Sequence, residues 1–249
     1  MTEITPLGPS HFSINADYTE SVFLHYYQQI HHVLVMNPRT VLIVGVGDHL
    51  VSDFLKRKGL SVKTLDNDPF LQPDYLRDIR QSLTINEDFD LVLASEIFEH
   101  FKFSRFESAL ENLKPVAGNF LVISLPYPTV RLFPPRPKYG KVVSCEGRIY
   151  TYLPQYFYTP VAKFYIFLKR IILYKFDVVR AWRSTFKPPE YPDDKADVHH
   201  WDLGCWRTRR TMVRSIISKH FKILREKVYI NTNCVFFTLE KRSNETQLT

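Results

Sequence analysis

Residues 40–47 read TVLIVGVG, an apolar run that ends in two glycines with one residue between them. A near-continuous apolar run of this kind is typical of a parallel strand that is buried on both faces. The glycines predict a tight turn, because glycine adopts backbone angles that other residues avoid. A helix is expected over 48–58, and Gly59 is a plausible residue to end it. This strand, turn and helix indicate an α/β fold.

The alternation of strand and helix continues along the chain. Further strands are expected at 60–65, 75–77, 89–94, 120–125, 221–230 and 234–241, and further helices at 20–35, 104–113 and 208–219. Alternating elements predict a doubly wound, mostly parallel sheet. The short connection at 231–233 predicts a final hairpin. We therefore expect a Rossmann-like sheet of seven strands, of which one is antiparallel.

A basic and aromatic segment follows the fifth predicted strand. Residues 127–187 hold twelve basic and two acidic residues, a net charge of +10, and 15 of the 36 aromatic residues of the chain. The whole chain carries +7, so the remainder carries −3. We expect 1–126 and 199–249 to form one domain. Residues 127–198 would then be a basic, aromatic, proline-rich insertion that acts as a lid or holds the acceptor.

The insertion has a readable helix. Apolar residues recur at spacings of three and four over 161–183, and they leave charged residues on the opposite arc. A lid packed on the sheet domain is slightly favoured, and peripheral contact with a membrane is the alternative. Five prolines between 126 and 137 predict a stiff, extended arm before this helix.

Composition excludes several classes of protein. With 45% hydrophobic and 24% charged residues, the chain can build a core and is not globally disordered. The three cysteines, Cys145, Cys205 and Cys234, are too few and too scattered for a disulfide framework. The N-terminus lacks the basic and apolar stretches of a signal peptide, and no segment approaches a membrane span. A cytoplasmic protein with reduced thiols is expected.

The glycine turn suggests a ligand. Gly45, Val46 and Gly47 would let a ligand approach the backbone, and the next helix N-terminus favours a negative group on it. Asp66 lies 21 residues after Gly45, at the end of a strand, where a carboxylate can accept hydrogen bonds from both ribose hydroxyls. The pattern fits dinucleotides and adenosyl ligands, or simply a turn and a solvated acid. Leu50 stands where a dinucleotide fingerprint requires glycine, which speaks against NAD.

Residues 89–100 read FDLVLASEIFEH, which closely resembles the fourth-strand signature of class I S-adenosylmethionine-dependent methyltransferases. The segments VLIVGVG, VKTLDNDP, DYLRDI and NFLVISLP stand in the order of that family, so the resemblance covers about 39–126. The sequence looks most like the ubiquinone-biosynthesis and small-molecule branch. The resemblance implies S-adenosyl-L-methionine as the cofactor.

The resemblance also implies roles for individual residues. The turn would pass the methionine part of the cofactor, the acid after the second strand would hold the ribose, and the acid after the third would approach the adenine amine. These roles fall on Gly45, Val46 and Gly47, on Asp66 with Asn67, and on Asp78 with Ile79, while Ser95 and Glu96 line the site. Ile43 stands where the family usually has an acid, and His49 where it usually has a third glycine.

Glu96, Glu99 and His100 would share one face if their stretch were helical. Some quinone-pathway relatives that resemble this sequence bind magnesium with such a triplet. The alternative is that Glu99 and His100 only order the loop, since one imidazole among carboxylates is a poor magnesium cage. The alternative is preferred, and no metal site is assigned.

Residues 199–204 read HHWDLG, similar to a His-Trp-acid-Gly run where related methyltransferases return over the active site. His199 or His200 could take a proton from a substrate hydroxyl. Equally, the run could be a structural corner, with Trp201 buried and Asp202 or a histidine as a cap.

These features together predict a methyltransferase that acts on an oxygen of a small-molecule, glycan or lipid-linked acceptor, with an anionic group to suit the basic insertion. Nucleic acid is a rival acceptor. It is disfavoured because Ala94-Ser95-Glu96 replaces the Asn/Asp-Pro-Pro-aromatic motif of base-amine methyltransferases. A methyltransferase-like binding protein without catalysis is the second rival, which Ile43 and His49 leave open.

Overall fold

The computed structural model describes residues 20–127, 142–145, 148–151, 198–204, 208–229 and 231–242. The expected helix over 161–183, the proline-rich arm after residue 127, and Cys205 lie outside these residues. Within the described ranges, every helix is too short or too polar to traverse a bilayer.

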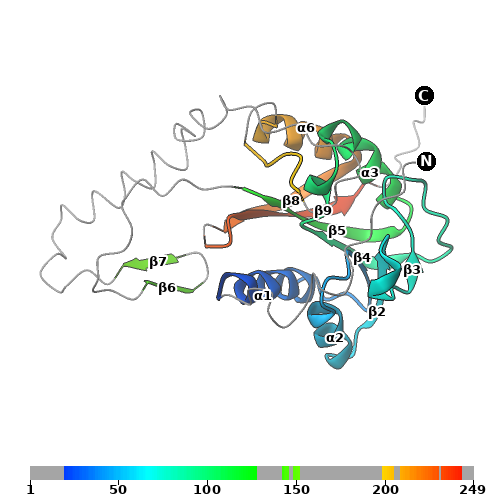
Figure 1. Ribbon diagram of the computed structural model, residues 1–249, viewed down its shortest axis with the longest axis horizontal. Helices are drawn as coiled ribbons and strands as arrows, with labels where there is room; N and C mark the ends of the chain where they lie inside the picture. Colours follow the sequence, from blue (N-terminus) through cyan, green and yellow to red (C-terminus); the bar gives the residue numbers. More distant parts are fainter. Residues whose placement is uncertain are drawn as a thin grey trace, which may run out of the picture.

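A seven-stranded sheet with the order β3-β2-β1-β4-β5-β9-β8 forms the centre of the molecule (Figure 1). Its strands are β1 (Thr40–Val44), β2 (Ser61–Asp66), β3 (Tyr75–Leu76), β4 (Phe89–Ser95), β5 (Ala117–Pro126), β8 (Phe221–Tyr229) and β9 (Cys234–Lys241). The first five run parallel, whereas β9 is antiparallel to both β5 and β8. The expected mostly parallel sheet with one antiparallel strand is confirmed.

The strand register gathers the carboxyl ends of β1, β2 and β4 at one edge. Val44 pairs with Leu65 of β2 on one side and with Ala94 of β4 on the other. The chain order reverses at β1, which makes this edge the topological switch point where open α/β sheets bind ligands. The glycine turn, Asp66 and Ser95 all follow directly from these strand ends.

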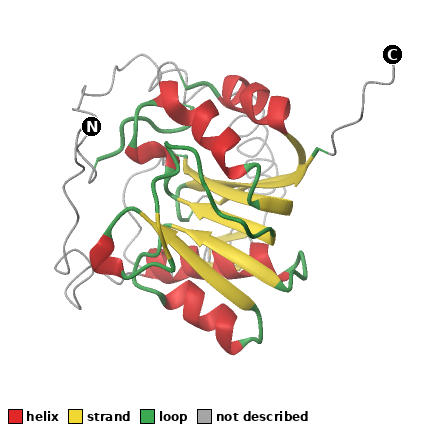
Figure 2. Cartoon of the chain, turned by 90° about the vertical axis from the view of Figure 1, so that its right-hand side faces the viewer, coloured by secondary structure: helices red, strands yellow, loops and turns green. Residues whose placement is uncertain are grey.

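Two layers of helices cover the sheet. The helices α1 (Glu20–Leu34) and α2 (Leu50–Arg57) lie on one face, and α3 (Phe106–Leu113) and α6 (Arg210–His220) lie on the other (Figure 1). Figure 2 shows the strands as a middle layer between them. Such a sandwich is what a sheet that is apolar on both faces requires.

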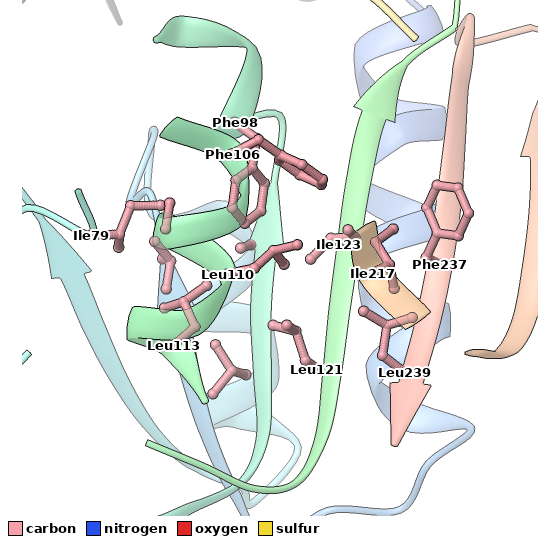
Figure 3. Packing of buried hydrophobic residues seen from close by; sticks show 14 of the residues in the cluster. Ile79, Phe98, Phe106, Leu110, Leu113, Leu121, Ile123, Ile217, Phe237 and Leu239 are labelled. Atoms are coloured by element: carbon pink, nitrogen blue, oxygen red, sulfur yellow. The ribbon is translucent and has the colours of Figure 1, made fainter. Parts of the chain in front are cut away.

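The larger core lies between the sheet and the layer of α3 and α6 (Figure 3). Leu121 and Ile123 of β5 face this core, whereas Val122 faces α1 and α2, because side chains alternate along a strand. Leu110 of α3 and Ile217 of α6 close the layer, and both are fully buried. Each such side chain stabilises the fold by about 1.5–3 kcal/mol.

A buried histidine docks α1 against the C-terminal strands. The ring of His32 stacks on Phe236 with centroids 4.6 Å apart. Its Nδ1 lies 3.2 Å from Oγ1 of Thr238 and its Nε2 lies 3.1 Å from the hydroxyl of Tyr229. Burial lowers the pKa of His32 to about 3, so the ring is neutral in the folded protein.

The two ends of the insertion meet at the edge of the sheet. The amide of Leu203 donates a hydrogen bond to the carbonyl oxygen of Pro126 at 2.9 Å. Tyr127 is still buried in the core, with its amide bonded to the carbonyl of Asn233. The chain positions on either side of the insertion therefore lie next to each other.

Two paired strands are described within the insertion. Strands β6 (Val142–Cys145) and β7 (Arg148–Thr151) pair antiparallel as a separate two-stranded sheet. No strands were expected in this part of the chain. A sequence pattern for two strands is nevertheless present, since β-branched and aromatic residues lie on both sides of the dipeptide Glu146-Gly147.

Several predicted boundaries differ from the structure by one to three residues, and two of these differences have clear local reasons. Strand β5 begins at Ala117, three residues earlier than expected, because Ala117 pairs with Phe89 across a register shift. Helix α2 begins at Leu50 rather than at residue 48, because the turn extends through His49.

Candidate active site

The turn after β1 contains three residues with left-handed backbone angles. Gly45, Gly47 and His49 have φ of 83°, 59° and 64°. A Cβ on Gly45 would overlap Cδ1 of Ile97, whereas a Cβ on Gly47 would meet no atom of the described residues within 4 Å. The turn is therefore closed by Ile97 on one side and open beside Gly47, where a ligand can reach the backbone.

His49 keeps the backbone conformation that glycine adopts easily. It occupies the position where the resembling family has its third glycine, and its left-handed geometry costs about 1–2 kcal/mol for a residue with a Cβ. Asp48 supports the turn, since its Oδ1 accepts from the amide of Leu50 at 3.1 Å and its Oδ2 from the Tyr26 hydroxyl at 2.7 Å. His49 thus adopts a backbone conformation that would suit glycine.

Asp66 joins the ends of β1 and β2. Its Oδ2 accepts a hydrogen bond from the amide of Val46 at 2.8 Å, and its Oδ1 accepts one from the amide of Asp68 at 2.9 Å. The side chain is half-buried, and neighbouring Asn67 is exposed. A carboxylate can accept about four hydrogen bonds. Asp66 is therefore fixed in direction and retains acceptor capacity for hydroxyl groups.

Asp78 is engaged by an arginine. The Nε of Arg80 lies 2.9 Å from both carboxylate oxygens, and its Nη2 lies 2.6 Å from Oδ2. Ile79 beside it is buried in the core, and its carbonyl accepts from Asn112 at 2.9 Å. The predicted contact of Asp78 with an adenine amine would have to share this carboxylate with Arg80.

The residues after β4 do not form one helix. Glu96 is left-handed, with φ of 53°, and the short 3-10 helix η3 begins only at Phe98 (Phe98–His100). The condition under which Glu96, Glu99 and His100 would share a helical face is therefore not met. The cause is Ser124 of β5, whose Oγ accepts from the amide of Glu96 at 3.0 Å and donates to its Oε1 at 2.9 Å.

Ser124 also belongs to a hydrogen-bonded chain that reaches α1. Its Oγ lies 2.8 Å from Oγ of Ser95, which lies 3.1 Å from Nε2 of His25. Burial lowers the pKa of His25 to about 4, so this ring is neutral and can donate from Nε2. The chain of hydrogen bonds connects α1, β4 and β5 at the predicted cofactor end of the sheet.

A half-buried carboxyl group, that of Glu96, and a fully buried one, that of Glu99, follow β4. Burial raises the pKa of Glu96 to about 7. Burial and the charge of Glu96 raise the pKa of Glu99 well above its ordinary value. Among the described residues, neither carboxyl oxygen of Glu99 has a hydrogen-bond partner.

The return segment 198–204 packs directly on η3. The amide of His200 donates to the carbonyl oxygen of Glu99 at 2.7 Å. The Nε1 of Trp201 donates to the carbonyl oxygens of Phe98 and Phe101, both at 3.0 Å, and Trp201 is buried. Trp201 therefore forms the buried corner that one interpretation of the sequence expected.

The predicted catalytic histidines directly precede Trp201 in the chain. His199 is exposed, and its Nδ1 lies 2.9 Å from Oδ1 of Asp202. That hydrogen bond raises the pKa of His199. The ring of His199 stands edge-on to that of His100, with centroids 5.3 Å apart and an interplanar angle of 88°. His200 is half-buried.

Four supporting residues escaped the sequence analysis: His25, Tyr26, Asp48 and Ser124. Three of them act through side-chain contacts between elements far apart in the chain, so no local spacing marks them. Asp48 alone had a local signal, because it directly follows the glycine turn and precedes a helix.

No protein-family model and no curated protein matches the chain. Several solved structures resemble it. The N-methyltransferase NodS from Bradyrhizobium japonicum, in complex with S-adenosyl-L-homocysteine, has a TM-score of 0.51 at 11% identity and covers 92% of each chain. Magnesium protoporphyrin IX methyltransferase from Synechocystis, with the same ligand, has a TM-score of 0.50 at 14% identity, covering 90% of this chain and 86% of that one.

The third is 1,6-didemethyltoxoflavin-N1-methyltransferase from Burkholderia thailandensis, with a TM-score of 0.51 at 10% identity, covering 94% of this chain and 85% of that one. At such identities a likeness describes the fold alone. The chain has the Rossmann-like fold that these three methyltransferases share.

Proposed function

We propose that the chain is an S-adenosylmethionine-dependent methyltransferase that acts on an oxygen of a small-molecule acceptor, glycan and lipid-linked acceptors included. The observation that carries the proposal is the bond between Asp66 and Val46 at the switch point of the sheet. It holds an acid that can accept ribose hydroxyls beside a glycine turn open to a ligand. The resemblance to the ubiquinone-biosynthesis and small-molecule branch supports such an acceptor.

The residues of this edge suit the cofactor. The open side of Gly47 gives the methionine part access to the backbone amides, and Asp66 with Asn67 would bind the ribose. Asp78 and Ile79 would lie at the adenine, and Ser95 and Glu96 would line the wall beside it. When bound, S-adenosyl-L-methionine supplies an electrophilic methyl group on sulfur.

The return segment would serve the acceptor. An acceptor hydroxyl must lose its proton when its oxygen gains the methyl group, and His199 and His200 are the candidate proton acceptors. Asp202 holds the ring of His199 in one orientation through Nδ1. A general base placed in this way accelerates a reaction by about 10²–10⁴.

The basic insertion would attract the acceptor. The charge of +10 over 127–187, against −3 for the rest of the chain, favours an acceptor with phosphate, carboxylate or an anionic lipid anchor. Exposed charges are screened within about 8 Å at physiological salt. Acceptor binding, or binding to anionic liposomes, should therefore weaken with salt and with Lys169, Arg170 and Arg180 changed to Gln. If neither salt nor these substitutions changes acceptor or liposome binding, the insertion acts only as a lid.

Calorimetry with S-adenosyl-L-methionine and S-adenosyl-L-homocysteine tests the cofactor assignment. Binding of both supports it, and no binding at about 1 mM, an affinity of only about 4 kcal/mol, would refute it. Transfer of labelled methyl groups to a panel of hydroxylated small molecules, glycans and lipids then tests the reaction. Transfer to RNA or DNA instead would favour the nucleic-acid alternative. Binding with no transfer to any acceptor would favour the non-catalytic one.

A further inference from the structure

Glu99 lies in an environment that does not suit a lone carboxyl group. Its side chain has no solvent exposure, and among the described residues neither oxygen has a hydrogen-bond partner. Buried polar groups are almost always paired, because an unpaired one loses its hydration without compensation. The environment therefore calls for either a proton on Glu99 or a cation beside it.

Two imidazole rings converge on this carboxyl group. Donor atoms of Glu99, His100 and His199 all lie within 4.8 Å of one another. His100 comes from η3, whereas His199 comes from the return segment, about a hundred residues later in the chain. The bond from the His200 amide to the Glu99 carbonyl and the two bonds of Trp201 hold these segments together.

His199 is oriented as metal-binding histidines usually are. Its Nδ1 is engaged by Asp202 at 2.9 Å, which leaves Nε2 as the ligand atom. A carboxylate on the second ring nitrogen fixes the tautomer and raises the basicity of the ligand nitrogen.

We propose that Glu99, His100 and His199 form a binding site for one divalent transition-metal ion of the zinc type. Two imidazoles and one carboxylate suit Zn²⁺ and its neighbours, whereas Mg²⁺ takes oxygen ligands. Three protein ligands leave one tetrahedral position open, as in catalytic zinc sites. Bonds of about 2.0–2.1 Å place tetrahedral donors about 3.4 Å apart, so side-chain rotation must draw the donors slightly closer on binding.

This ligand set differs from the magnesium triplet that the sequence suggested. The carboxylate of Glu96 accepts from Ser124, and Glu96 is not one of the three converging residues. With His199 as a ligand, His200 remains as the proton acceptor of the pair. The metal site itself does not depend on the proposed methyl transfer.

Titration of the chelator-stripped full chain with Zn²⁺, Co²⁺ and Mg²⁺ tests the site. We expect one Zn²⁺ per chain, bound at least about tenfold more tightly than Mg²⁺, and a visible Co²⁺ absorption spectrum of low-coordinate type. Glu99→Gln, His100→Gln and His199→Gln should each weaken Zn²⁺ binding by about 10–100-fold or more, and Asp202→Asn by about 10–100-fold.

A matched control separates this site from other histidines. The chain has nine histidines, and His31→Gln on α1, outside the cluster, should leave Zn²⁺ affinity unchanged. His199 is exposed, so His199→Gln decides the matter even if Glu99→Gln does not fold. Unchanged Zn²⁺ affinity in His199→Gln and in a variant that combines Glu99→Gln, His100→Gln and His199→Gln would overturn the proposal. No transition-metal binding by the wild type would also overturn it and leave Glu99 a buried neutral acid. Cofactor affinity, measured separately, reports on the methyltransferase proposal alone.

Discussion

The carboxylate of Asp66 holds the amide of Val46 at 2.8 Å, so the residue that ends β2 also fixes the turn that ends β1. Under the proposed function, this one side chain would both bind the ribose and shape the turn beside it. Asp90 is a second acid that bonds backbone amides, but it lies away from the proposed ligand site. Asp90 accepts from the amides of Arg39 and Thr40 at the opposite end of β1, at 2.8 and 3.1 Å.

Asp66→Ala should weaken binding of S-adenosyl-L-methionine by about 10–100-fold, because it removes charge-assisted hydrogen bonds of about 1.5–3 kcal/mol each. Asp90→Ala removes comparable bonds to the backbone and should lower the free energy of unfolding with little change in cofactor affinity. Calorimetric titration of both variants makes the comparison. Equal affinities in the two variants would mean that the ribose does not lie at Asp66.

Gly45→Ala should impair the cofactor site more than Gly59→Ala. Both positions have positive φ, so both variants should lose about 1–2 kcal/mol of stability. Only at Gly45 does the new Cβ also meet the side chain of Ile97. Ile97→Val removes the overlapping Cδ1, and Cγ1 stays 3.2 Å away. The double variant should therefore recover affinity that Gly45→Ala loses, and a lack of recovery would place the defect elsewhere.

His49→Gly should stabilise the protein by about 0.5–1 kcal/mol, since glycine adopts the left-handed conformation of this residue without a Cβ penalty. His49→Ala keeps the Cβ and should give no such gain. Urea denaturation compares the two variants. Equal stabilities would show that the His49 ring makes a compensating contact.

Acid should destabilise the fold through His32. Its pKa is about 3 in the folded protein and 6.5 when unfolded, so below pH 6.5 the unfolded chain binds a proton that the folded chain does not. Stability is therefore retained above pH 6.5 and falls with decreasing pH, by up to about 1.4 kcal/mol per unit. His32→Gln should be less stable at pH 7.5 but lose less between pH 6.5 and 5. Parallel pH profiles for variant and wild type would contradict this account.

His200→Ala should lower the methyl-transfer rate much more than cofactor affinity, by about 10²-fold or more if it removes the general base. His199→Ala is the necessary comparison, because His199 and His200 are consecutive residues and either could be the base. Rate measurements from pH 6 to 9, about two units on either side of a histidine pKa, separate them. Full activity in both variants would leave the segment a structural corner only.

Most of the sheet was predictable because its strands carry strong local signals. Apolar runs such as those at β1 and β4, separated by helices, indicate parallel strands. The short connection before β9 indicates that β9 is antiparallel to β8. Bonds between distant elements were not predictable. Ser124 forces Glu96 into a left-handed conformation across 28 residues of sequence, and this overrides the helical spacing of Glu96, Glu99 and His100.

The same distinction applies to the candidate site. The glycine turn and Asp66 follow from their positions at strand ends, which the alternation of elements reveals. The convergence of His100 and His199 depends on how the return segment packs, with Trp201 bonded to carbonyls about a hundred residues earlier. Hydrophobic periodicity contains no information about that pairing.

Strand β9, the last in the sequence, lies between β5 and β8 in the sheet, and this position affects when its contacts can form during folding. His32 on α1 and Thr238 on β9 are 206 residues apart in sequence, yet their side chains meet. As the ribosome releases the chain, α1 emerges early and its docking surface emerges among the last described residues. Closing so long a loop is entropically costly, and proteins rich in such contacts fold slowly. Helix α1, which supplies His25 and Tyr26 to the predicted cofactor end, therefore completes its contacts with β9 only when the C-terminal strands have joined the sheet.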